Sequence, residues 1–373
     1  MNKFWLCFAV SLLAVAPAPA ETRPPLPGSR DLSMEMTRKL AEAGDAAAQY
    51  NLGYSYYRGE GRPQDQAAAA QWFRKAAEQG VFQAQFALAV CYREGHGVKR
   101  DDVEAGKWLR KAAGQGDAKA QLLLATCHQA GRGVPQSEVE AAQWFQKAAE
   151  QGVVRAQFEL ALCLREGRGV PKDTAAAATW LQRAAEKNDA RSQFLLGVQQ
   201  EAGDGVPQSF PDAVKNFRAA AGQGLAAAQY NLGVLCAYGR GVPQDHTEAV
   251  KWFRLAAEQG DAQAQFNLAL CYEKGQGLKP DLAAAAGWYR RAAAQGDVRA
   301  QLNLGACLAK GQGVARDPVE AYAWFNLAAA AGDTNALAAR DWLQKLLTAA
   351  QIAEGQRRAT ALVVQTNVPA AHR

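Results

Sequence analysis

A chain of 373 residues, of which 49% are hydrophobic, 9% aromatic and 21% charged, has the composition of a folded protein, which excludes wholesale disorder. Its 42 basic and 36 acidic residues leave a balance of +6, and this mild excess excludes a strongly nucleic-acid-seeking surface. The length exceeds what one compact core usually serves, so it predicts two domains or an extended array.

Residues 1–20 have the order of a secretory signal peptide. Lys3 precedes the apolar run Phe4–Val15, and Ala18-Pro19-Ala20 forms a small-x-small cleavage site. The run of about twelve residues is shorter than the roughly 20 that span a bilayer. We therefore expect cleavage after Ala20 and a periplasmic or secreted product. Residues 21–30 follow as a Pro-rich leader.

A period of 36 residues organises the next part of the chain, residues 48–335. Counted from zero in each block, position 1 is always Gln, position 4 always Leu, and positions 11 and 13 always Gly. Position 5 is Gly or Ala, and position 24 is Trp in seven blocks. The eight blocks begin at Ala48, Ala84, Ala120, Ala156, Ser192, Ala228, Ala264 and Ala300.

Each block predicts two helices separated by the Gly-x-Gly turn. Position 17 is Asp or Ser in every block, which predicts the N-cap of the second helix. Gly at position 32 predicts a left-handed end to that helix, and Asn188 takes this place once. The small residue at position 5 predicts a close approach of the two helices, with the rings at positions 24 and 25 filling the seams.

The remaining segments predict caps for this array. Residues 31–47 resemble only a second helix, residues 336–363 read as two C-terminal capping helices, and residues 364–373 as a tail. In the fifth block Asn216 replaces the Trp, so we expect weaker packing around residues 188–216.

The block pattern Ala-Gln-Tyr-Asn-Leu-Gly, Gly-x-Gly-Val-Pro-x-Asp and Ala-x-x-Trp-Phe-x-x-Ala-Ala-x-Gln-Gly resembles the Sel-one-like repeat (SLR), a relative of the tetratricopeptide repeat. The resemblance implies an all-α fold, a right-handed α/α superhelical solenoid whose first helices line a concave face. It also implies scaffold or adaptor roles in bacterial envelope, secretion, signalling and host-interaction assemblies.

Motifs for catalysis are missing from the sequence: it contains no Ser-x-x-Lys, Gly-x-Ser-x-Gly, His-Glu-x-x-His or Cys-x-x-Cys. We therefore predict no catalytic residue, no metal site and no cofactor. His128 is expected to be a packed imidazole. Five of the cysteines after residue 20 share position 7, and stacked helices about 8–10 Å apart exceed the disulfide range of about 4.4–6.8 Å. In a cysteine-rich branch of the family, disulfides join the two helices of a pair. The position that would hold the second cysteine, at the end of the second helix, is Ala in every block here, so we expect six free, buried thiols.

The family's geometry implies that positions 2, 6, 9 and 10 face the groove. Position 2 is always apolar or aromatic, which fits packing between first helices as well as binding. Positions 9 and 10 vary most, as a surface tuned to one partner would, although drift on a solvated surface gives the same pattern. The candidate groove residues are Tyr57, Arg93, Gln129, Arg165, Glu201, Tyr238, Glu273 and Lys310.

Three functions are weighed. The first is a non-catalytic exported scaffold, expected to be monomeric, that binds a protein or peptide of the envelope and has neither a nucleic-acid partner nor an integral membrane segment. The second is a protein that binds or modifies peptidoglycan or glycans of the cell wall, which the missing catalytic residues disfavour. The third is a secreted host-interaction factor, which differs from the first only in its final location.

Overall fold

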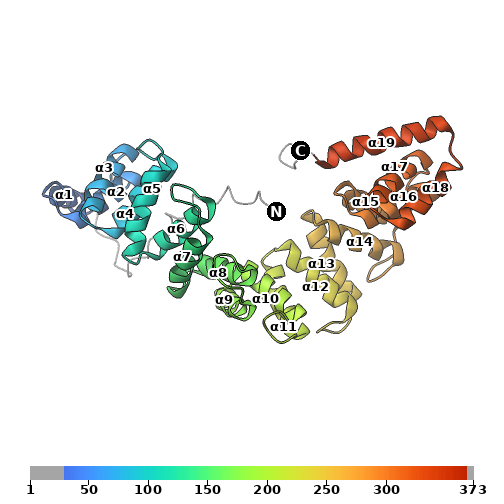
Figure 1. The fold of residues 1–373 in the computed structure, drawn as a ribbon, viewed down its shortest axis with the longest axis horizontal. Helices are drawn as coiled ribbons and strands as arrows, with labels where there is room; N and C mark the ends of the chain where they lie inside the picture. The colour runs from blue at the N-terminus through green and yellow to red at the C-terminus, as the bar shows by residue number, and fades with distance from the viewer. Residues whose placement is uncertain (1–28, 368–373) are drawn as a thin grey trace. The chain divides into compact units, whose positions relative to one another are not determined.

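The computed structural model describes residues 29–367, and within them all regular structure is α-helical (Figure 1). The chain divides into two compact units between Ala184 and Ala185. The expected signal peptide at residues 1–20 lies outside the described residues, as do nearly all of the Pro-rich leader and the end of the tail. No helix between residues 29 and 367 has the length and hydropathy to cross a bilayer.

Eight consecutive helix pairs form the array, preceded by α1 (Ser29–Glu42). The first helices of the pairs are α2 (Ala46–Arg58), α4 (Phe82–Glu94), α6 (Ala118–Ala130), α8 (Val154–Glu166), α10 (Ala190–Ala202), α12 (Ala226–Tyr238), α14 (Ala262–Lys274) and α16 (Val298–Lys310). The second helices are α3 (Gln66–Glu78), α5 (Asp102–Gly114), α7 (Glu138–Glu150), α9 (Thr174–Glu186), α11 (Phe210–Gly222), α13 (His246–Glu258), α15 (Leu282–Ala294) and α17 (Pro318–Ala330). Within each unit, a second helix packs on its own first helix and on the first helix of the next pair.

The predicted caps of the second helices and the left-handed residues after them are confirmed, whereas the first helices begin two residues before position 0, as at Ala46. In the first repeat the Asp65 carboxylate accepts a hydrogen bond from the Ala68 amide at 2.9 Å, and Asp or Ser caps the second helix in the other repeats in the same way. Gly80 has φ +92° and Asn188 φ +63°, as expected for left-handed helix ends. A second set of caps was not predicted: Asp45 and five equivalent aspartates cap the helices that follow them.

Position 5 brings the two helices of a repeat together, as predicted. A Cβ atom added to Gly53 would lie 2.7 Å from the ring of Phe73 at position 25. Gly197, Gly233 and Gly305 face Phe217, Phe253 and Phe325 with similar distances. The small residue therefore makes room for a ring that is almost completely buried.

The expectation for the tryptophans at position 24 is only partly right. Those of repeats one to four, six and seven are half-buried, and in five of these repeats a Lys or Arg three residues later lies over the indole, as with Lys147 and Trp144 at 4.0 Å. Trp324 is 2% exposed, in the core cluster on which Ile352 of the last helix packs. The main filler of the seams is thus the residue at position 25.

The glutamine at position 1 links neighbouring repeats, a role that sequence periodicity did not reveal. Gln85 is buried, and its Nε2 donates to the Ala77 carbonyl of the preceding repeat at 3.2 Å. Its Oε1 accepts from Nε2 of Gln115 at position 31, at 2.8 Å. Five other repeats have the same bond: Gln79–Gln49, Gln151–Gln121, Gln223–Gln193, Gln259–Gln229 and Gln295–Gln265.

Repeat eight lacks this bond, because Ala331 occupies position 31 and Gln301 Oε1 is buried without a hydrogen-bond partner among the described residues. The backbone at Ala331 (φ −83°, ψ 3°) matches that at Gln79 (φ −80°, ψ 3°). We expect Ala331→Gln to stabilise the C-terminal unit by about 0.5–1.5 kcal/mol, measured by thermal unfolding. Ala331→Glu is the matched control, because a carboxylate cannot donate to Oε1, and equal gains from both variants would contradict the explanation.

The C-terminal helices end the array by different means. α18 (Thr334–Gln344) takes the place of a ninth first helix and packs on α17. Arg340 and Asp341 stand where the repeats have Leu and Gly or Ala, and they form an ion pair at 2.8 Å. α19 (Ala349–Asn367) packs on α17, where Arg358 bonds Asp317 at 3.0 Å. Polar residues thus replace the surface on which another helix would pack.

In the fifth repeat, Asn216 replaces the position-24 Trp and donates from Nδ2 to Gln200 Oε1 at 2.8 Å. One partly exposed hydrogen bond stabilises less than the packing of an indole. We therefore expect residues 188–216 to open first in native-state hydrogen exchange. Exchange that is uniform along the array would contradict this.

Candidate partner-binding face

The exposed side of the first helices is the candidate surface, called here the first-helix face. Positions 0, 1, 4, 5 and 7 of these helices are mostly or always buried. Position 10 is exposed in all eight repeats, positions 6 and 9 are mostly half-buried, and position 2 is buried in half of the repeats. The ring at position 2 contacts the ring at position 25 of its own repeat, as in Tyr50–Phe73 with centroids 5.9 Å apart. The side chain at position 2 therefore contributes to packing within its own repeat. Positions 6, 9 and 10 supply most of the variable surface.

In the N-terminal unit the face begins with tyrosines. Tyr57 is half-buried, with its ring centroid 6.5 Å from that of Phe73 and 6.0 Å from that of His96. Burial raises the pKa of the Tyr57 hydroxyl, so it stays neutral and able to donate. Gln129 is also half-buried, at the end of α6.

Both candidate arginines of this unit are paired within the chain. Arg93 is only 8% exposed, and its Nε lies 2.8 Å from the Glu94 carboxylate. Arg165 is half-buried and lies 3.2 Å from Glu166. Arg93 is thus compensated by Glu94, whereas Glu166 is shared between Arg165 and Arg168, whose Nε lies 2.7 Å from it, so that cluster keeps a net positive charge. Arg93 is too buried to serve as a primary contact.

In the C-terminal unit the four candidates differ in availability. Glu201 is half-buried, and burial raises the pKa of its carboxyl group. Glu273 accepts a hydrogen bond from the Tyr289 hydroxyl at 2.7 Å, and burial together with this bond raises the pKa of Tyr289. Tyr238 is 69% exposed with the Arg240 guanidinium 5.6 Å from its ring centroid, and Lys310 is exposed.

Two residues of this face were missed because α18 was treated as a cap alone. The 36-residue register continues into α18 and places Trp342 at position 6, while Leu346, two residues after the end of α18, has the number of position 10. Their exposed fractions are 58% and 61%. Extending the position count by one helix would have found them.

The groups with potential for catalysis are buried. His128 is 3% exposed with its Nδ1 atom 3.0 Å from the Pro135 carbonyl, so the expected packed imidazole is confirmed. Cys91, Cys127, Cys163, Cys236, Cys271 and Cys307 are free and buried, also as expected. Between residues 29 and 367, no group of three or more His, Cys, Asp or Glu side chains is placed to hold a metal ion.

These thiols have a measurable property. Burial raises the pKa of Cys91 to about 12 and that of Cys163 to about 11, so almost no thiolate forms near neutral pH. We expect six reactive thiols after residue 20 in the unfolded, unreduced chain, and none that reacts rapidly in the native chain. Titration with a thiol reagent measures both, and a count well below six in the unfolded chain would show disulfides.

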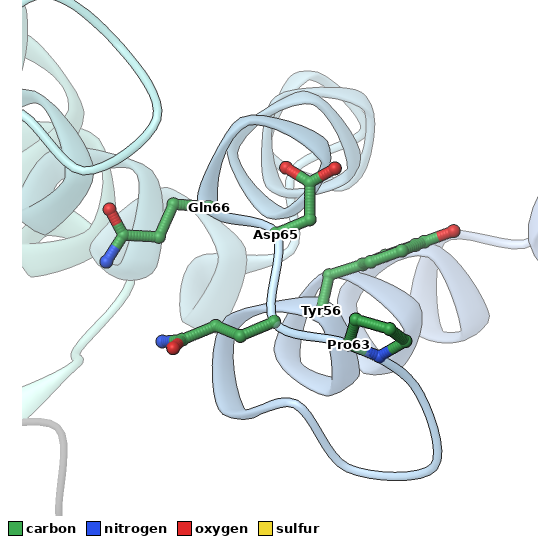
Figure 2. Close-up of a pocket in the computed structure, with 5 residues that line it drawn as sticks. Tyr56, Pro63, Asp65 and Gln66 are labelled. Carbon is green, nitrogen blue, oxygen red and sulfur yellow. The ribbon is translucent and has the colours of Figure 1, made fainter.

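A hollow of about 640 Å³ lies away from the first-helix face, beside the loop between α2 and α3. Tyr56 and residues 63–66 line it (Figure 2). The Asp65 carboxylate there already accepts the Ala68 amide as an N-cap. This carboxylate therefore serves the structure of α3.

The repeat pattern matches the model of the Sel1 repeat at residues 46–81, 82–117, 118–153, 154–189, 190–225, 226–261, 262–297 and 298–333. The chain belongs to the Sel1 repeat family. Each matched block begins two residues before the period used above and coincides with the start of a first helix. The expected all-α solenoid of eight repeats is confirmed.

Two solved structures are similar in sequence to this chain. A Sel1 repeat protein from Oxalobacter formigenes is 32% identical over 91% of this chain and 100% of its own, with a TM-score of 0.66. The protein c5321, a protective antigen present in uropathogenic Escherichia coli strains displaying an SLR fold, is 32% identical over 90% of this chain and 87% of its own, with a TM-score of 0.49. No curated protein matches the chain. Sel1 repeat proteins are generally scaffolds for protein interaction.

Proposed function

We propose that this Sel1 repeat protein is an exported, monomeric, non-catalytic scaffold that binds a protein or peptide of the bacterial envelope on its first-helix face. One observation carries the proposal. The packing positions repeat almost unchanged, whereas positions 9 and 10 of the first helices change from repeat to repeat; position 10 is exposed throughout and position 9 is mostly half-buried. Repeats with constant packing and a variable accessible side are suited to recognition of one partner.

Affinity capture from the native envelope tests the binding role. Tyr57 and Tyr238 are the informative candidates, because aromatic side chains dominate interface energetics and neither is fully buried. We expect the double variant Tyr57→Ala and Tyr238→Ala to lose most of the captured partner. Arg110→Ala with Lys251→Ala, two exposed positions on second helices, is the matched control. Unchanged capture by the tyrosine variant would remove these two side chains from the interface.

Export is tested separately. The proposal requires a mature N-terminus at Glu21 and recovery from the periplasm or the medium. N-terminal sequencing after cell fractionation measures both, and an intact chain in the cytoplasm would contradict export. Recovery from the medium alone would favour the host-interaction role. Mass photometry of the purified chain measures the oligomeric state.

A further inference from the structure

The C-terminal end of the first-helix face combines exposed apolar and basic side chains. Trp342 lies in the last turn of α18 and Leu346 in the turn that follows Gln344, and both are more than half exposed. In the preceding repeats of this unit, position 6 holds a half-buried Val, Leu or Ala: Val198, Val234, Leu270 and Ala306. An exposed indole next to an exposed leucine is a potential anchoring site for an apolar side chain.

The neighbouring cations have no internal counter-ion. Lys274 and Lys310 occupy position 10 of α14 and α16, and Lys345 adjoins the end of α18; all three are exposed. Within the described residues none of them forms an ion pair, in contrast to Arg93 and Arg165. The adjacent acid Glu273 accepts a hydrogen bond from the neutral Tyr289 hydroxyl and keeps its negative charge. Three lysines beside this one acid leave the end of the face with a net positive charge.

The spacing of these side chains fits an extended chain. Lys274 and Lys310 occupy position 10 of two successive first helices, and Leu346 follows in the turn after α18. α14 and α16 both pack on α15, helices in contact lie about 8–10 Å apart, and an extended peptide advances about 3.3 Å per residue. One step between first helices therefore corresponds to about three to six residues of a bound segment.

We propose that this end of the first-helix face binds an extended acidic segment of a partner protein, with acidic residues against Lys274 and Lys310 and a large apolar side chain against Trp342 and Leu346. The inference rests on the proposed scaffold function and names the chemical class of the partner. Charge attraction guides the segment to the face, and the apolar side chain fixes its register.

Fluorescence anisotropy with the full chain tests the proposal. The probes are labelled peptides of Gly and Ser that contain two aspartates and one phenylalanine, spaced about three to six residues apart, in both orders. We expect one order to bind saturably. Replacing both aspartates by asparagine, or the phenylalanine by serine, is expected to weaken binding at least about tenfold.

Variants of the chain locate the site. Lys274→Glu with Lys310→Glu, and separately Trp342→Ala, are expected to weaken binding by at least about tenfold. Lys215→Glu with Lys251→Glu makes the same charge change on exposed second-helix positions of the same unit and is expected to leave binding within about twofold. Because all these residues are exposed, the variants should unfold at the same temperature as the parent chain, which calorimetry checks.

Several outcomes would overturn the inference: no saturable binding at millimolar peptide, equal binding of the asparagine peptide, or equal losses from the control variant. They leave the scaffold function standing if the envelope capture still yields a partner. A captured partner that is insensitive to the Lys274, Lys310 and Trp342 variants likewise removes this site alone. Capture of no partner would remove the scaffold function itself.

Discussion

Gly133→Ala is expected to destabilise the N-terminal unit by about 3–5 kcal/mol, among the largest effects of a single methyl group. Gly133 has φ +70°, and an added Cβ would lie 1.7 Å from the Asp102 carbonyl oxygen at the start of the preceding second helix. The loop and that helix would have to separate. Loss of hydrogen-exchange protection in α5 and α6, together with a lower melting temperature, measures the effect.

Gly116→Ala is the matched control for this prediction. Gly116 also has a positive φ, +94°, but a Cβ there would meet nothing within 4 Å. Only the backbone strain remains, which costs about 1 kcal/mol. Equal losses from the two variants would show that the contact with Asp102 is unimportant, and that the glycines serve only to permit a left-handed turn.

The glycines show how far the sequence could predict the fold. The period of the glycines predicted the length of the repeat, the ends of the helices and the residues with a left-handed backbone, because these features depend on local backbone conformation. It did not distinguish Gly116 from Gly133, although both recur in nearly every repeat. The distinction depends on what another repeat places next to the glycine, and a single period contains no such information.

The same limit applies to the candidate surface. Arg93 and Arg165 were selected for their side-chain type, but both form ion pairs within the chain, with Glu94 and Glu166. Lys310, selected from the same positions, has no ion pair among the described residues, and Trp342 was outside the repeats that were counted. The type of each side chain can be read from the sequence. Its burial and the pairing of its charge depend on which residues lie beside it in the folded chain.

Phe145→Ala is expected to cost about 3–5 kcal/mol, whereas Trp144→Ala, one residue earlier, is expected to cost only about 1–2 kcal/mol. Phe145 is completely buried between α6, α7 and α8 in its core cluster, and its removal leaves a cavity. Trp144 is half-buried, and part of its surface is covered by the flexible Lys147 side chain, which can follow the shortened residue.

Trp324→Ala distinguishes burial from residue type as the cause of this difference. Trp324 occupies the same repeat position as Trp144 but is only 2% exposed. The free energy lost in Trp324→Ala is therefore expected to resemble that lost in Phe145→Ala. Denaturant unfolding of each variant, with hydrogen exchange to assign the loss to one unit, measures all three. If both tryptophan variants lost the same free energy, position within the repeat would set the stability, and the covering of Trp324 at the end of the array would be irrelevant. The expected inequality instead means that a repeat's contribution depends on what packs against it, so identical sequence positions are not equivalent along the solenoid.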